Sequence, residues 1–97
     1  GPRGAIPTIK MIRDDDLKGK VLMASFDLEP VTIQAIKDGI CEGAMDQQQY
    51  LQGYMAVVEL YLNAKFQLDP ADYDTGRGFV TPENVDAVAA LVRAGYR

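Results

Sequence analysis

Two polar residues, Asp27 and Gln47, have types and positions that are typical of a ligand site. Asp27 directly follows a largely apolar run at residues 21–26, and Gln47 comes just after a second short run at residues 41–45. Both runs have the length of strands in a parallel sheet, and such sheets bind ligands beyond the carboxyl ends of their strands. A carboxylate accepts hydrogen bonds from two neighbouring hydroxyls, whereas an amide both donates and accepts. The pair therefore suits a neutral polyhydroxylated ligand.

Each of these residues also has a purely structural interpretation. Asp27 is close enough to Pro30 to cap a helix that begins there, and Gln47 is a residue type that commonly lies in solvent. The spacing alone leaves both interpretations open.

Catalytic, metal and redox chemistry finds little support in the residue types. The chain has no histidine and a single cysteine, Cys41, which the pattern places inside a strand as a small buried hydrophobe. The acidic triplet at residues 14–16 lacks the spaced ligands of a calcium loop and indicates a solvated turn. No two carboxylates are placed to face each other as glycoside hydrolysis requires. The sequence predicts no catalytic residue, no metal ligand and no cofactor.

Composition favours one small globular domain. The chain has 97 residues, of which 47% are hydrophobic, and its 10 basic and 14 acidic residues give a formal net charge of −4. This charge disfavours nucleic acid as a partner, because binding to phosphates relies on clustered Lys and Arg. The apolar runs are much shorter than a membrane span, and residues 1–20 contain no apolar core of a signal peptide.

The periodicity of the apolar residues predicts an α/β chain. Helix is expected at residues 5–12 and 30–38, and the strands at 21–26 and 41–45 flank the second of these helices. The first strand is apolar on both faces, which favours a parallel sheet with helices on each side. The elements expected after it are a helix at 50–66 whose apolar stripe packs in the core, a polar loop, a strand at 79–80 and a helix at 82–94 capped by Thr81.

Several short motifs, taken in order, resemble the C-terminal third of type I periplasmic sugar-binding proteins, the family of the ribose-binding protein. The motifs are Phe26-Asp27, Ala35-Ile36-Lys37-Asp38-Gly39, Asp46-Gln47-Gln48-Gln49-Tyr50, Gly53-Tyr54 and Val80-Thr81-Pro82-Glu83-Asn84-Val85-Asp86. The resemblance extends from about Ala5 to Tyr96. Two positions depart from the family pattern: Ser25 stands where glycine is usual, and Gln49 where proline is usual.

This resemblance implies an α/β chain that is part of a two-lobed periplasmic-binding-protein-like fold. Residues 1–47 would form the second half of the C-terminal lobe, residues 48–80 would return to the N-terminal lobe, and residues 81–97 would form the closing helix. Asp27 and Gln47 would contact a sugar or polyol, and Gln47 and Gln48 would lie at the hinge. Because two lobes need more than 97 residues, we expect a fragment that self-associates or lacks a partner piece.

The resemblance further implies a non-catalytic receptor of an ABC importer. Its partners would be the sugar or polyol, the remainder of the two-lobed protein and the membrane permease, and its location would be the periplasm, with a signal peptide outside this chain. An alternative is a fragment of the effector-binding domain of a lac-repressor-type regulator, which shares the fold. A helix-turn-helix upstream would distinguish the regulator from the receptor.

Overall fold

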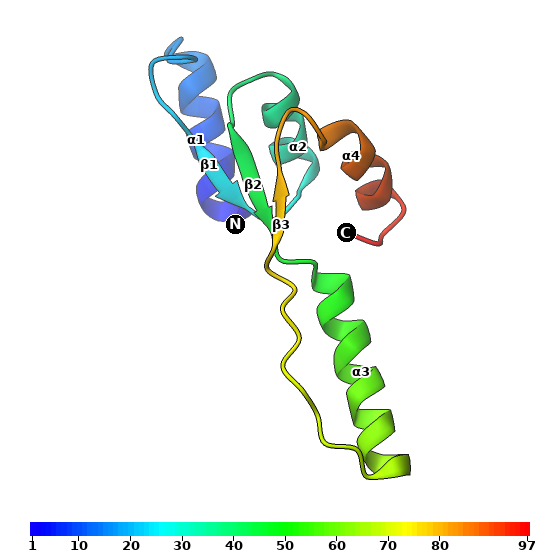
Figure 1. Ribbon diagram of the computed structural model, residues 1–97. Helices are drawn as coiled ribbons and strands as arrows, with labels where there is room; N and C mark the ends of the chain where they lie inside the picture. The colour runs from blue at the N-terminus through cyan, green and yellow to red at the C-terminus, as the bar shows by residue number, and fades with distance from the viewer.

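The computed structural model describes residues 1–97 and has an α/β architecture (Figure 1). A three-stranded sheet has the strand order β1-β2-β3. The pair β1 and β2 is parallel, with Ser25 opposite Ala44, and the pair β2 and β3 is antiparallel, with Ala44 opposite Val80. The elements are α1 (Pro2–Asp14), β1 (Ala24–Phe26), α2 (Pro30–Lys37), β2 (Gly43–Asp46), α3 (Gln49–Phe66), β3 (Gly78–Val80) and α4 (Val85–Arg93).

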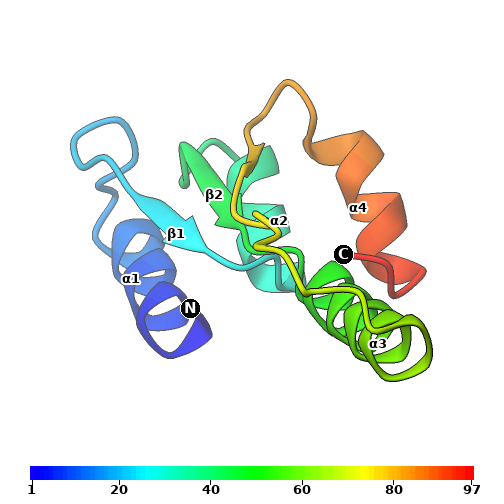
Figure 2. The same cartoon turned by 60° about the horizontal axis from the view of Figure 1, so that its bottom comes forward.

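One face of the sheet is covered by α1, α2 and α4 (Figures 1 and 2). The strand residues on this face, Ser25, Ala44 and Val80, are all buried. The core beneath them is aliphatic, because each helix turns its apolar stripe toward the sheet. Its fully buried members include Ile12 of α1 and Ile36 of α2.

The opposite face of the sheet is open. The register aligns Phe26, Met45 and Phe79 in one row across the three strands. Phe26 is 58% exposed and Phe79 is 49% exposed. The prediction of a strand buried on both faces is therefore wrong, since no helix covers this side. The sheet is also mixed rather than purely parallel, because β3 runs antiparallel to β2.

Several predicted boundaries shift in the structure, among them α1, which spans Pro2–Asp14 rather than residues 5–12. The first strand begins at Ala24 rather than at residue 21, and Leu22, which precedes it, is 79% exposed. The second begins at Gly43, so Cys41 precedes the strand, although it is buried as predicted. The last helix begins at Val85, and its N-cap position is taken by Asn84 rather than by Thr81.

A side-chain turn replaces the predicted first turn of the last helix. The Asn84 Oδ1 accepts the backbone N–H of Thr81 at 2.9 Å, and its Nδ2 donates to the Phe79 carbonyl at 3.1 Å. Asparagine commonly stabilises turns in this way, in competition with helix. The chain therefore reaches Val85 before helical geometry begins.

Helix α3 and the returning segment at residues 67–77 extend away from the sheet and its helices (Figure 1). The molecule is accordingly elongated, with principal extents of 58 × 22 × 18 Å. No residue of α3 is buried, and Val57 and Leu60 are 67% and 70% exposed, so the predicted core packing of this helix is wrong for the chain as it stands. No helix of the chain combines the length and hydropathy needed to cross a membrane.

Candidate functional site

Asp27 and Gln47 lie side by side at the end of the parallel strand pair. Asp27 follows β1 and continues its pairing, because its backbone N–H donates to the Met45 carbonyl at 2.9 Å. Gln47 follows β2, and its Nε2 donates to the Asp27 Oδ1 at 3.0 Å. The structure therefore brings together the two residues singled out from the sequence. It does not place Asp27 as a cap of α2, whose N-cap residue is Glu29.

A third residue, Gln49, joins this pair at the first position of α3. Its Nε2 donates to the same Asp27 Oδ1 at 2.6 Å. The other carboxylate oxygen of Asp27, Oδ2, accepts no hydrogen bond within the chain and can accept one from a ligand hydroxyl. Sequence reasoning noted Gln49 only as a departure from proline. The sequence did contain a signal for this role: Gln49 carries an amide, and it stands two residues after Gln47, directly before a predicted helix.

The backbone at both strand exits takes an uncommon conformation. Asp27 has φ +72° and Gln48 has φ +56°, both in the left-handed region. For residues other than glycine this conformation costs about 1–2 kcal/mol, although Asp tolerates it better than most. Such strained residues cluster at functional sites, because they turn the chain sharply and aim the neighbouring side chains.

Gln48 stands between the sheet and the extended part of the chain. Its Nε2 donates to the Thr75 carbonyl at 2.9 Å, and its backbone N–H donates to the Asp46 Oδ1 at 2.9 Å. Gln52 adds two bonds from the first turn of α3, one to the Gln47 carbonyl at 2.9 Å and one to the Thr75 Oγ1 at 3.2 Å. Amide hydrogen bonds thus connect the start of α3 with the end of the returning segment, at the place where both leave the sheet.

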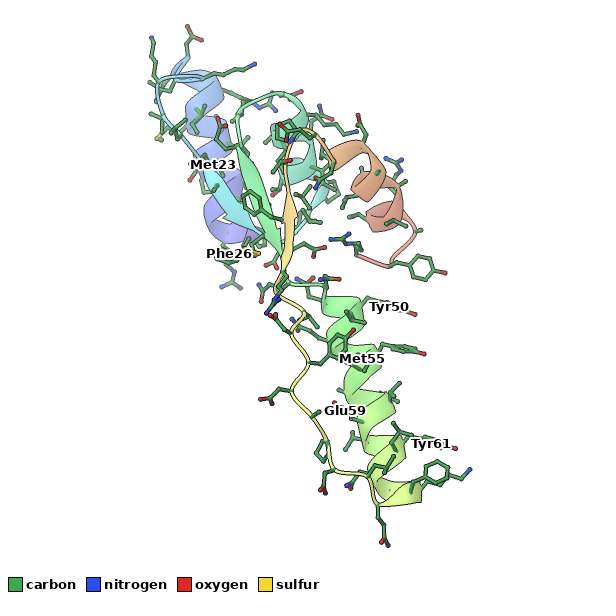
Figure 3. All side chains as sticks on the ribbon, viewed as in Figure 1. Met23, Phe26, Tyr50, Met55, Glu59 and Tyr61 are labelled. Carbon is green, nitrogen blue, oxygen red and sulfur yellow. The ribbon has the colours of Figure 1, made fainter.

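The side chains of α3 differ between the side of the helix that faces the returning segment and the side that faces away from it. Tyr50 and Tyr61 project away from the returning segment, whereas Met55 and Glu59 lie toward it (Figure 3). The Tyr50 ring meets the Tyr96 ring edge-on, with 5.5 Å between the centroids. Glu59 Oε1 accepts the backbone N–H of residue 71 at 3.3 Å, which holds the segment against the helix.

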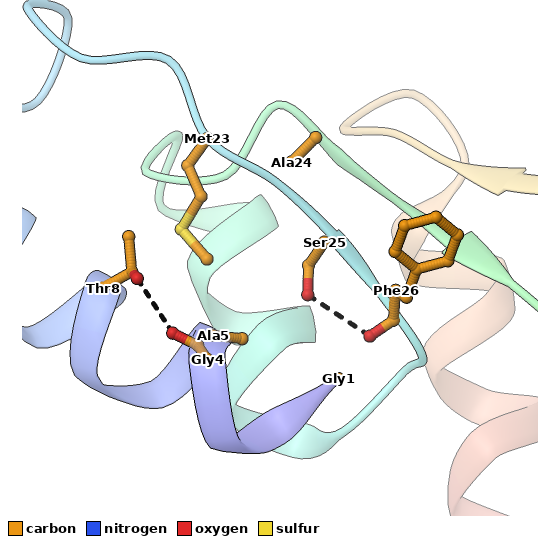
Figure 4. Close-up of a pocket in the computed structure, with 8 residues that line it drawn as sticks. All are labelled: Gly1, Gly4, Ala5, Thr8, Met23, Ala24, Ser25 and Phe26. Atoms are coloured by element: carbon orange, nitrogen blue, oxygen red, sulfur yellow. Dashed lines mark hydrogen bonds between the residues drawn. The ribbon is translucent and has the colours of Figure 1, made fainter.

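A shallow cavity of about 250 Å³ lies between α1 and β1, beside Phe26 (Figure 4). Both of its hydroxyls are already used: Thr8 Oγ1 donates to the Gly4 carbonyl at 2.8 Å, and Ser25 Oγ donates to the Phe26 carbonyl at 3.3 Å. The walls are otherwise backbone and small or apolar side chains. This cavity therefore offers fewer free polar groups than the Asp27 cluster.

The chain shows no second centre with reactive chemistry. No three side chains of the His, Cys, Asp and Glu types gather where they would hold a metal ion. Burial raises the pKa of the Cys41 thiol, and its Sγ donates to the Gly43 carbonyl at 3.2 Å. A buried thiol with a raised pKa is a poor nucleophile. Asp14 ends α1 and pairs there with Lys10, and the other two acidic residues, Asp15 and Asp16, form the turn that follows.

Open α/β sheets bind ligands beyond the carboxyl ends of their strands, and the cluster of Asp27 with Gln47 and Gln49 lies at that place in this chain. No protein-family model matches the chain. The chain is 39% identical over 69 residues to the xylose/arabinose-binding protein XylF of Sulfolobus acidocaldarius. That match covers 69% of this chain and 17% of the relative, so the chain corresponds to less than a fifth of its length. Its fold is compatible with part of a periplasmic-binding-protein fold.

Proposed function

We propose that the chain is part of a sugar or polyol receptor of an ABC importer, and that it binds its ligand without catalysis. The observation that carries this proposal is the cluster of Asp27 with Gln47 and Gln49 beyond the parallel strands. The similarity to a sugar-binding protein supports the same role.

The cluster offers the hydrogen-bonding groups that a sugar needs. Asp27 Oδ2 is free to accept a hydroxyl proton, and the amide of Gln47 carries an acceptor oxygen beside its donated N–H. Hydrogen bonds to an ionised acceptor contribute about 1.5–3 kcal/mol each, more than those between neutral groups. In this proposal Asp27 and Gln47 contact the sugar directly.

The proposed two-lobed organisation explains the elongated shape. Residues 1–47 belong to the C-terminal lobe, residues 48–80 return to the N-terminal lobe, and residues 81–97 form the closing segment. Large apolar side chains normally lie in a core, yet α3 has no buried residue and exposes Val57 and Leu60. Its covering layer would come from the remainder of the two-lobed protein. The lobes would close over the sugar by rotation at Gln47 and Gln48.

The location and the further partners follow from the receptor role. A sugar receptor of an importer works outside the cytoplasm, which favours a periplasmic or other extracellular location. The closed receptor would then dock on the membrane permease.

A titration of the 15N-labelled chain with sugars tests this proposal. D-Xylose and L-arabinose should shift the side-chain amide signals of Gln47 and Gln49 at about 100 mM, since one net charge-assisted hydrogen bond supports a Kd of that order. Tetrahydropyran, which has the ring without the hydroxyls, serves as the matched control ligand. Asp27→Asn should abolish the shifts, and Asp15→Asn, at an exposed position without side-chain bonds, should preserve them. The absence of any sugar-specific shift would refute the proposal.

A further inference from the structure

Asp46, the last residue of β2, carries a buried carboxylate that the proposed sugar contacts do not use. It is 1% exposed. Its Oδ2 accepts a hydrogen bond from the Arg97 Nε at 2.7 Å, and its Oδ1 accepts the backbone N–H of Gln48 at 2.9 Å. Both oxygens of a buried anion are therefore engaged, one by a cation 51 residues away in the sequence and one by the Gln48 backbone.

The absence of a side chain at Gly78 leaves space for the ion pair of Asp46 and Arg97. Gly78 lies opposite Asp46 in the antiparallel register of β2 and β3. A Cβ at Gly78 would come within 3.0 Å of the Arg97 Nη2 and 3.2 Å of the Asp46 carbonyl oxygen. The backbone at Gly78 does not require a positive φ, so the need for glycine here is one of space.

The bond from Asp46 to Gln48 acts on the residues on either side of Gln48. Gln48 is in the left-handed conformation, which turns the chain between Gln47 and Gln49. Those two glutamines donate to the same oxygen of Asp27. Fixing the Gln48 N–H therefore fixes the points from which both amides reach Asp27.

Stability alone does not account for such a pair. A buried ion pair contributes little net stability, because desolvation offsets most of the attraction, and apolar replacements are often as stable. What an apolar residue at position 46 would lack is an acceptor for the Gln48 N–H at the strained turn.

We infer that Asp46 and Arg97 are positioning residues for the Asp27 cluster: the Arg97 guanidinium orients the Asp46 carboxylate, which holds the Gln48 backbone and thereby aligns Gln47 and Gln49 on Asp27. The description of that cluster as a sugar site rests on the proposed function. The alignment itself is a property of the chain and is measurable without any sugar.

Hydrogen exchange and amide signals of the 15N-labelled chain test the inference. In Arg97→Gln, exchange of the Gln48 backbone N–H should accelerate about 10-fold to 100-fold, the loss expected when a bond to an ionised acceptor weakens. The side-chain amide signals of Gln47 and Gln49 should shift as well, although neither side chain is hydrogen-bonded to Arg97. Arg97→Lys, which keeps the charge, should restore most of the protection. Arg93→Gln is the matched control, because Arg93 forms no ion pair in the structure.

A glycine pair provides a second test that leaves both charged residues in place. Gly78→Ala should displace the guanidinium and reproduce the effect of Arg97→Gln. Gly76→Ala should have no such effect, since its Cβ would lie 3.5 Å from the nearest side-chain atom, an ordinary contact. Inaccessibility of the Cys41 thiol verifies that each variant is folded.

The outcomes separate this inference from the proposed function. Unchanged Gln48 exchange and unchanged Gln47 and Gln49 amides in both Arg97→Gln and Gly78→Ala would overturn the inference. If both variants loosen the turn while no sugar perturbs the chain, the positioning role is supported and the sugar-binding proposal fails.

Discussion

Replacing Asp27 with asparagine tests whether the charge of this residue holds the cluster together. The substitution preserves the shape of the side chain and suits a left-handed backbone, so it isolates the loss of charge. Each of the two bonds to Oδ1 changes from about 1.5–3 kcal/mol to about 0.5–1.5 kcal/mol. Because both glutamine side chains are exposed, solvent screening reduces the combined loss to about 1 kcal/mol.

Urea unfolding measures this loss. For an m value of about 2 kcal/mol per molar, a loss of about 1 kcal/mol lowers the unfolding midpoint by about 0.5 M. Asp15→Asn is the control, because Asp15 is exposed and its side chain makes no hydrogen bond, so its midpoint should not change. Equal midpoints for the two variants, with unshifted amides at Gln47 and Gln49, would refute the argument that Asp27 organises this edge of the sheet.

Three further predictions concern the fold. The Cys41 thiol, buried and with a raised pKa, should not react with a disulfide reagent at pH 8 until urea unfolds the chain, and rapid reaction without urea would contradict its burial. Hydrogen bonds from Arg13 and then Gln34 lower the pKa of Asp38, so their stabilisation is complete above the unfolded pKa of about 3.8 and is lost as the pH falls through the lower folded pKa. Urea midpoints between pH 2 and 6 should show this loss, and Arg13→Gln should make it smaller, whereas an unchanged pH dependence in that variant would contradict the role of Arg13. The open sheet face should drive self-association that light scattering detects as a mass rising with concentration, and Phe79→Ser should reduce it, whereas a wild-type monomer at all concentrations would contradict this.

The helices were predictable from the sequence because their signals are local. The apolar spacing placed the bodies of α1, α2 and α3 within a few residues of their observed bounds, and Pro30 and Gly39 marked the two ends of α2. The last helix was predicted three residues too early, because the side chain of Asn84 bonds the Thr81 N–H and the Phe79 carbonyl in a turn that competes with the helix start. The meeting of Asp27 and Gln47 was also predictable, since parallel strands share one carboxyl edge.

The remaining features depend on contacts that no local pattern encodes. An apolar run such as residues 21–26 is suited to a strand with helices on both faces. It does not show that this chain contains the helices for the second face. The antiparallel direction of β3 follows from the path of residues 67–77 rather than from its own residues. The bond between Arg97 and Asp46 joins residues 51 positions apart, and neither neighbourhood indicates the other.

The elongated arm formed by α3 and the returning segment gives the turn at Gln48 a mechanical consequence. At 1.5 Å per residue, the 18 residues of α3 span about 27 Å from Gln48 to Phe66. A rotation of about 10° at the base of such a lever displaces its far end by about 5 Å. Changes of a few tenths of an ångström in the hydrogen bonds around Asp46 and Gln48 are thus amplified at the tip of the helix. The turn at Gln48 therefore controls the position of the residues at the far end of α3.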